Sequence, residues 1–276
     1  MEQHEERLSE LYDGLLRSPA LNHDADDRRD LVSTRTRHLL MLRLIDEHLE
    51  GQRHAIADIG PGNGALLWLA LHIGFKGAIA IDYSHWQPER SFLTGADEVE
   101  FVVANFNEEA CLAEIADASV DTVVATEVLE HILNHPSGFL SECWRVLRPG
   151  GIFVISTPNP CTLANALRLL MGRPFLWNDE WFAETPKFKE GQLVAYPFVH
   201  YREYPPKVFL GLLGELPGAS IVVAGFIAHA GEPSRKKVKA HALTMIQRIR
   251  LDDRRLVSHT QYAVVKKREL VRSVGQ

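Results

Sequence analysis

A strand, a glycine-rich turn and a helix follow one another between residues 55 and 66, and this stretch constrains the fold more than any other. A short apolar run ends at Asp58, and a second apolar run with helical character covers residues 65–73. Between them, three glycines occupy every second position: Gly60, Gly62 and Gly64. Glycine permits positive φ and a close approach of ligand to backbone, and a helix start offers unpaired N–H groups. The stretch therefore predicts an α/β fold with a nucleoside-bearing ligand against the turn.

The residue before the turn narrows the choice of ligand. Asp58 stands two residues before the first glycine, where a carboxylate suits a cationic ligand and disfavours a pyrophosphate. S-adenosylmethionine carries a sulfonium and an ammonium group, so the acid favours it over NAD. However, Gly60, Gly62 and Ala65 also satisfy a loose form of the dinucleotide-binding pattern. An NAD-dependent oxidoreductase therefore stays open as an alternative, although no Ser/Tyr-x-x-x-Lys hydride-transfer site is recognisable.

A second acid follows at the distance expected for a ribose ligand. Residues 77–82 read as a second parallel strand that ends in Asp82, 24 residues beyond Asp58. An acid at the tip of the second strand, about 20 residues past the glycines, is placed to accept the ribose hydroxyls. Tyr83 follows it and is a candidate for stacking on adenine. We predict Asp82 and Tyr83 as cofactor-binding residues.

Several ordered motifs resemble those of a known family. The segments Asp58–Gly64 (DIGPGNG), Glu127–His131 (EVLEH) and Leu147–Gly151 (LRPGG) are similar to motifs of class I S-adenosylmethionine-dependent methyltransferases, in their small-molecule branch. The resemblance covers residues 53–157. It implies a Rossmann-like α/β fold with helices on both faces of a seven-stranded sheet. The implied strand order is 3-2-1-4-5-7-6 with strand 7 antiparallel, and S-adenosylmethionine is the implied cofactor.

The resemblance also suggests roles for residues after the third and fourth strands. Asn105, followed by Phe106, stands where the family commonly has an Asp that binds the adenine amino group. Thr126 is the last residue of the predicted strand 120–126, and Glu127 follows it. The resemblance places both beside the methionine part of the cofactor. Glu127, Glu130 and His131 are three and four residues apart and are expected to share one helix face. His131, looking towards the acceptor, is the first candidate general base, and His200 in the segment 200–204 is the second.

The chain divides into three predicted parts. Residues 1–52 contain two amphipathic helices, over 3–17 and 28–50, which form either a cap over the cofactor site or plain packing against the sheet. Residues 53–276 form the methyltransferase domain. Within it, residues 158–205 are an insertion after strand 5, and residues 175–204 hold 9 of the 23 aromatic residues. Such a segment is expected to face the substrate, with a self-packed loop as the alternative.

Composition and charge limit the remaining possibilities. The net charge is −6, yet residues 229–276 hold twelve Lys or Arg against four Asp or Glu. This basic region leaves an RNA-directed methyltransferase open as an alternative, although the motifs disfavour a nucleic-acid partner. No apolar run reaches the roughly 18 residues of a membrane span. The three cysteines lie far apart without metal-ligand spacing, so no metal site and a cytoplasmic location are expected.

The predicted activity is methyl transfer from S-adenosylmethionine to a small-molecule acceptor, at a hydroxyl of a sugar, lipid or secondary metabolite. Residues 219–227 and 259–265 are expected to complete the sheet as its sixth and seventh strands, with an amphipathic helix over 236–250 between them.

Overall fold

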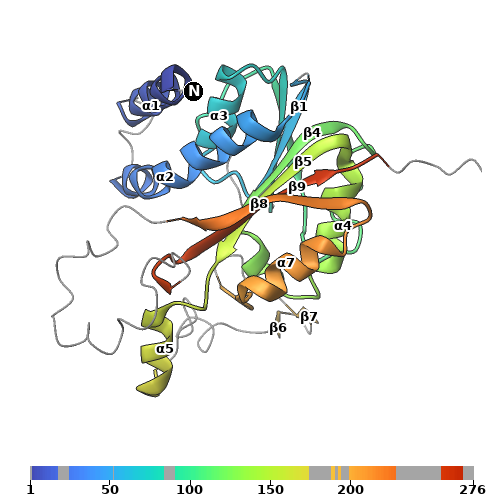
Figure 1. Cartoon of the computed structure of the whole chain (residues 1–276). Helices are drawn as coiled ribbons and strands as arrows, with labels where there is room; N and C mark the ends of the chain where they lie inside the picture. The colour runs from blue at the N-terminus through green and yellow to red at the C-terminus, as the bar shows by residue number, and fades with distance from the viewer. Residues whose placement is uncertain are drawn as a thin grey trace, which may run out of the picture.

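The computed structural model describes residues 2–17, 25–51, 53–83, 91–173, 188–189, 192–193, 199–227 and 256–269. Its main sheet has seven strands: β1 Ala55–Ile59, β2 Gly77–Asp82, β3 Val99–Val103, β4 Val120–Thr126, β5 Leu147–Pro158, β8 Ala219–Ile227 and β9 Thr260–Lys267. They are ordered β3-β2-β1-β4-β5-β9-β8, and β9 is antiparallel to both of its neighbours (Figure 1). A two-residue pairing of β6 Phe188–Lys189 with β7 Gln192–Leu193 lies outside this sheet. The predicted strand order and antiparallel strand are confirmed.

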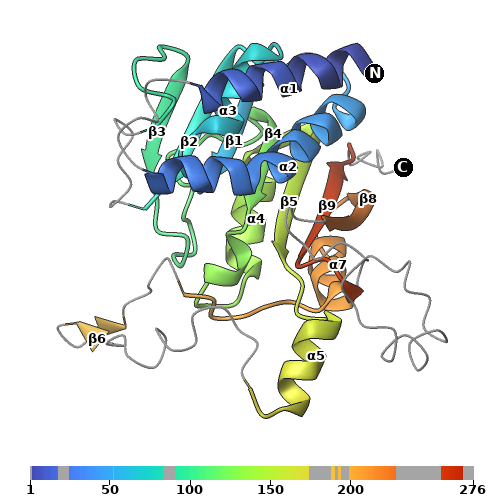
Figure 2. The same ribbon diagram turned by 90° about the vertical axis from the view of Figure 1, so that its left-hand side faces the viewer.

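Helices cover both faces of the sheet, as expected. The described helical segments are α1 Glu2–Leu16, α2 Ala25–His48, α3 Ala65–His72, the short 3-10 helix η3 Leu129–His131, α4 Ser137–Val146, α5 Leu163–Leu170 and α7 Pro206–Gly214. The first three lie on one face, and α4 and α7 lie on the other, while α5 projects beyond the sheet (Figures 1 and 2). The insertion after strand 5 therefore begins with a helix that stands apart from the sheet.

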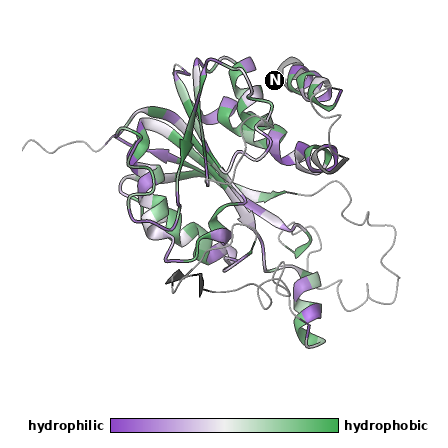
Figure 3. Cartoon of the chain, turned by 180° about the vertical axis from the view of Figure 1, so that it is seen from behind, coloured by the Kyte–Doolittle hydropathy of each residue, from purple (hydrophilic) through white to green (hydrophobic). Residues whose placement is uncertain are grey.

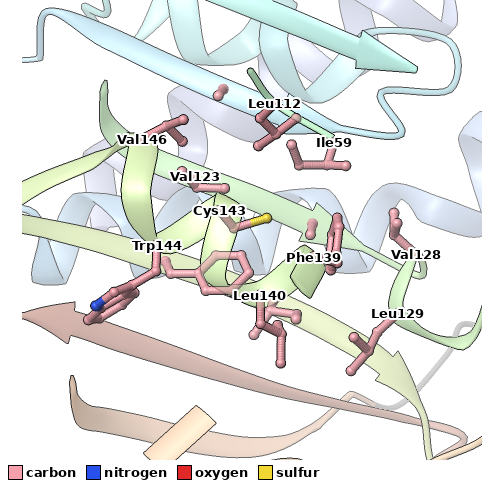
Figure 4. Packing of buried hydrophobic residues seen from close by; sticks show 14 of the residues in the cluster. Ile59, Leu112, Val123, Val128, Leu129, Phe139, Leu140, Cys143, Trp144 and Val146 are labelled. Carbon is pink, nitrogen blue, oxygen red and sulfur yellow. The ribbon is translucent and has the colours of Figure 1, made fainter. Parts of the chain in front are cut away.

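The buried strands supply both cores, because successive side chains of a strand point to opposite faces. All seven residues of β4 are buried. Val123 and Ala125 belong to the core beneath α4, whereas Val124 belongs to the core beneath α1, α2 and α3. Apolar ribbon is concentrated in the central strands (Figure 3), and Phe139, Cys143 and other α4 residues pack onto them (Figure 4). This is the pattern of a parallel sheet covered on both sides.

The N-terminal helices share a core with the sheet. Tyr12 of α1 and His38 of α2 are buried, and the Tyr12 hydroxyl lies 3.1 Å from His38 Nδ1. The same hydroxyl donates to the Leu31 carbonyl at 2.9 Å. Burial lowers the pKa of His38 to about 3, so the ring is neutral at physiological pH. The N-terminal helices pack against the sheet, which is one of the two roles that the sequence suggested for them. The other role, residues 1–52 as a cap over the cofactor site, stays a prediction.

Two sequence expectations fall largely or wholly outside the described residues. The aromatic residues between 174 and 187 and between 194 and 198 are not described, nor is the helix predicted over 236–250. Within the part of the chain that the structure describes, no helix has both the length and the apolar character needed to cross a membrane.

Candidate functional site

The candidate site lies at the carboxyl ends of the parallel strands. β1 pairs with β2 on one side and with β4 on the other. The chain runs from β1 to β2 and β3 on one side and then crosses to β4 on the other, so the strand order reverses at β1. In open α/β sheets, ligands bind in the crevice outside such a switch point. The last residues of β1, β2 and β4 and the loops after β1, β2, β3 and β4 carry all the residues that the sequence singled out except His200. The fold therefore gathers at one edge residues that are dispersed along the chain.

The glycine turn needs glycine at all three positions, but for different reasons. Gly60, Gly62 and Gly64 have φ values of 69°, 56° and 77°, in the left-handed region. A Cβ on Gly60 would lie 2.9 Å from Val128 Cγ2, and one on Gly64 would lie 2.6 Å from Leu93 Cγ. A Cβ on Gly62 would meet nothing within 4 Å. The outer two glycines thus permit close packing, while a Cβ on the middle one would contact none of the described residues.

Asp58 lies buried beneath this turn, with a side chain only 2% exposed. Among the residues that the structure describes, its Oδ1 atom has no hydrogen-bond partner. Burial, with repulsion from Asp82, raises the pKa of the Asp58 carboxyl well above its ordinary value. A buried polar atom without a partner is costly. A ligand that brings positive charge or N–H donors to the turn would remove that cost.

The ends of β2 and β3 place the predicted adenosine contacts. Asp82 ends β2, and its Oδ1 accepts a hydrogen bond from the Tyr83 N–H at 2.7 Å. The Tyr83 ring packs edge-on against buried Phe106, with centroids 4.8 Å apart. Asn105 is exposed, and its Oδ1 accepts from the Asn107 N–H at 3.2 Å. A carbonyl oxygen has two lone pairs, so this turn contact leaves capacity for the adenine amino group.

The end of β4 is tied to the end of β5. Thr126 is buried, and the Glu127 N–H donates to the Ser156 carbonyl at 3.0 Å. Glu127 Oε1 accepts from the Ser156 hydroxyl at 2.9 Å, and Glu127 has a positive φ of 57°. A non-glycine residue in this region is strained, and such strain gathers at functional sites. The strained backbone supports the predicted place of Glu127 in the site.

The prediction that Glu127, Glu130 and His131 share one helix face after β4 is wrong. Only residues 129–131 are helical, as one turn of 3-10 helix, and Glu127 lies before it with positive φ. Glu130 instead points inward and is fully buried, where its Oε2 accepts from the Thr157 hydroxyl at 2.8 Å. Its Oε1 has no hydrogen-bond partner. Burial, with repulsion from Glu127, raises the pKa of Glu130 well above its ordinary value.

The two candidate histidines are brought together beside Glu130. Their ring centroids are 5.0 Å apart, although 69 positions separate His131 and His200 in sequence. His131 Nδ1 lies 3.0 Å from the Val199 carbonyl, and the N–H groups of Tyr201 and Arg202 both donate to the Glu130 carbonyl. Burial lowers the pKa of His131 to about 4. The segment after the insertion is thus fixed to the loop after β4.

Sequence reasoning missed two further residues near the site, Arg37 and Asn107. Arg37 of α2 acts electrostatically on both Asp58 and Glu130, and its buried Nε has no hydrogen-bond partner. Asn107 donates from Nδ2 to the Tyr83 hydroxyl and accepts at Oδ1 from the Leu133 N–H, so it joins the two halves of the site. Neither residue belongs to a motif with a recognisable spacing, because each lies on an element far from the glycine turn in sequence. Only the folded structure shows that they lie near the site.

Comparison with known proteins agrees with this geometry. Residues 57–155 match the model of a family described as "Methyltransferase domain". Over these residues the chain is similar to a methyltransferase domain, in agreement with the motifs that resemble class I S-adenosylmethionine-dependent methyltransferases. S-adenosylmethionine is the cofactor of this methyltransferase family, and the matched residues span the glycine turn, β4 and most of β5. These similarities favour S-adenosylmethionine over the NAD-dependent alternative.

One relative and two solved structures illustrate the similarity of this methyltransferase. Ubiquinone biosynthesis O-methyltransferase from Caulobacter sp. (strain K31) is 34% identical over 119 residues, which are 43% of this chain and 45% of that protein. An S-adenosylmethionine-dependent methyltransferase from Archaeoglobus fulgidus has a TM-score of 0.53 at 19% identity, covering 84% of this chain and 94% of that chain. A geranyl diphosphate methyltransferase in complex with S-adenosylmethionine has a TM-score of 0.54 at 16% identity, covering 91% and 93%.

At these low sequence identities, the two solved structures show only that the fold is shared. The methyltransferase chain spans less than half the length of the curated relatives that it matches.

Proposed function

We propose that this chain transfers a methyl group from S-adenosylmethionine to a hydroxyl oxygen of a small-molecule acceptor, such as a sugar, lipid or secondary metabolite. The observation that carries the proposal is the grouping of Glu130, His131 and His200 at the strand ends beside the glycine turn. A relative named for O-methylation in ubiquinone biosynthesis supports an oxygen acceptor. The acceptor's identity is the part that experiment must supply.

The residues at the strand ends fit the cofactor. We assign the ribose to Asp82, the adenine to Tyr83, Asn105 and Phe106, and the methionine part to Asp58, Thr126 and Glu127, over the turn of Gly60, Gly62 and Gly64. The unpartnered Asp58 Oδ1 and the open space at Gly62 support this assignment. Arg37 is the cation within electrostatic reach of Asp58, and we add it as a partner for the cofactor carboxylate. When bound, S-adenosylmethionine supplies an electrophilic methyl group.

Positioning the acceptor is the main task left to the protein. Holding reactants at near-attack distance supplies roughly 7–11 kcal/mol of the barrier reduction, whereas a general base adds about 10²–10⁴-fold. His131 is neutral near pH 7, because burial lowers its pKa to about 4. Its Nδ1 must donate to the Val199 carbonyl, so its Nε2 carries a lone pair that can receive the hydroxyl hydrogen. We propose His131 and His200 as the residues that face the acceptor.

Two assays test the proposal together. Calorimetry with S-adenosylhomocysteine should show one saturable site per chain, whereas NAD should not compete for it. Incubation with methyl-labelled S-adenosylmethionine and a metabolite extract should label a small molecule as a methyl ether. Cofactor binding with label only in protein or RNA would contradict the acceptor class. The basic region 229–276 that suggested RNA lies mostly outside the described residues, and the cytoplasmic location stays a prediction.

A further inference from the structure

We propose that Glu130, His131 and His200 bind a divalent transition-metal ion of the Zn²⁺, Fe²⁺ or Mn²⁺ class. One carboxylate oxygen and one nitrogen from each ring converge, and all three atoms lie within 4.8 Å of one another. Glu130 Oε1 is 3.9 Å from His131 Nε2 and 4.0 Å from His200 Nε2. Two imidazoles and one carboxylate form a set that suits these metals rather than Mg²⁺ or Ca²⁺.

The ring orientations are those of metal ligands. His131 Nδ1 faces the Val199 carbonyl at 3.0 Å, and His200 Nδ1 faces Glu203 Oε1 at 3.0 Å. Carbonyl and carboxylate oxygens accept only, so each Nδ1 carries the hydrogen and each Nε2 carries the lone pair. Metal-binding histidines almost always donate their second ring N–H in this way. Both lone pairs therefore lie on the Glu130 side of the rings.

Glu130 supplies the independent observation. Its side chain is fully buried, its Oε2 accepts from the Thr157 hydroxyl, and its Oε1 has no hydrogen-bond partner among the described residues. A buried carboxylate oxygen with no donor is costly, and a cation between it and two imidazole lone pairs would satisfy it. Thr157 would hold the carboxylate in orientation, as the outer partners of metal ligands do.

The distances require a small closure. Zinc binds imidazole nitrogen and carboxylate oxygen at about 2.0–2.2 Å, so a tetrahedral ion holds its ligands roughly 3.4 Å apart. The two separations that involve Glu130 exceed this value by about half an ångström. The side chains of His131 and His200 are 19% and 12% exposed, which leaves access from solvent. A three-ligand site keeps at least one open position, as catalytic sites do.

The open position gives the ion a role in the proposed reaction. This role, unlike metal binding itself, rests on the proposed function. A divalent ion lowers the pKa of a bound hydroxyl or water by several units. An acceptor hydroxyl on the ion would release its proton to solvent and keep the oxygen lone pair for the new C–O bond. The two histidines then act as ligands, and the ion takes over activation of the acceptor.

Titration of the EDTA-treated full chain with Co²⁺ tests the site. We expect one ion per chain and a visible d–d absorption band typical of low coordination by nitrogen and oxygen. His200→Ala and Glu130→Gln should weaken binding at least about 100-fold, and Glu203→Gln, which alters only the orientation of His200, about 10-fold. Zn²⁺ should displace Co²⁺. His135, an exposed histidine near η3, provides a matched control, since His135→Ala should leave the affinity unchanged.

Failure of this inference is distinguishable from failure of the proposed function. Absence of saturable Co²⁺ binding, or equal loss of affinity in His135→Ala and His200→Ala, would overturn the metal site. Binding of S-adenosylhomocysteine, measured on the same samples, should persist in every variant and shows that the fold is intact. A chain that binds Co²⁺ as expected but never binds S-adenosylhomocysteine would refute the proposed function and leave the metal site standing.

Discussion

Asp58 and Asp82 lie at the carboxyl ends of neighbouring parallel strands, and the negative charge of Asp82 contributes to the raised pKa of the buried Asp58 carboxyl. Two acids at adjacent strand ends repel each other unless a cation or donor lies between or beside them. The pair is therefore more favourable with a positively charged nucleoside bound than without one.

Replacement of Asp82 should weaken cofactor binding without affecting the core. Asp82→Ala removes the proposed ribose acceptor, and the loss of charged hydrogen bonds costs about 1.5–3 kcal/mol, or roughly 10–150-fold in affinity. Calorimetry with S-adenosylhomocysteine measures this change. Asp97, an exposed acid in the loop before β3, serves as the control. Equal affinities for wild type and Asp82→Ala would remove Asp82 from the site.

Gly62 should be needed for binding more than for folding. Gly62→Val places a branched side chain in the open space above the turn, so S-adenosylhomocysteine binding should be lost. Gly95 also has positive φ, at 76°, and open space around its Cβ position. Gly95→Val therefore carries a similar backbone strain away from the site and should keep its affinity. If both variants lost binding to the same extent, backbone strain rather than obstruction of the site would explain the loss.

His38 should make the fold sensitive to acid. Its pKa is about 3 in the folded chain and about 6.5 when unfolded, so the unfolded state binds more protons between these values. Stability is then lost as pH falls below 6.5, by about 2 kcal/mol at pH 5. Urea unfolding at pH 7 and pH 5 measures this difference. His38→Gln should flatten the dependence, whereas His135→Gln at an exposed position should not; an unchanged slope in His38→Gln would exclude His38 as its source.

Ala118 offers a stabilising substitution. This exposed residue has a φ of 51°, in the region that costs a non-glycine residue about 1–2 kcal/mol. Glycine removes that strain but adds about 0.4–1 kcal/mol of unfolded-state entropy. Ala118→Gly should therefore raise the free energy of unfolding by about 0.5–1 kcal/mol, as judged by urea denaturation. Ala116→Gly, two residues earlier and without positive φ, should lower it; the reverse order would contradict the strain at Ala118.

Local pattern was sufficient for much of the fold. The bounds of β2, β4 and β8 agree with the sequence prediction, because apolar and β-branched runs between turn residues leave little choice. β5 begins at Leu147 rather than Ile152, since pairing with β4 extends it through the turn. The strand order came from the resemblance to a family. It could not come from periodicity, which says nothing of which strands are neighbours.

The site was predicted less completely than the fold. Asp58 and Asp82 lie in the last residues of two strands and the glycines follow one of them, so all are visible as motifs. The buried position of Glu130 was not visible in the sequence, because its spacing suggested a helix face shared with Glu127 and His131. The positive φ of Glu127 interrupts that helix, so the three residues do not share a face. Arg37 and Asn107 carry no motif at all. Such residues become visible only when the chain brings distant elements together.

The attachment of residues 199–202 to Glu130 has a consequence for how this enzyme diversifies. Two backbone N–H groups hold this segment to one carbonyl, and the Val199 carbonyl holds His131. Backbone contacts do not depend on side-chain identity, so the stretch that precedes Val199 can change in sequence or length while His200 keeps its place. Related proteins with the same backbone contacts can therefore vary that stretch and still keep His131 and His200 side by side.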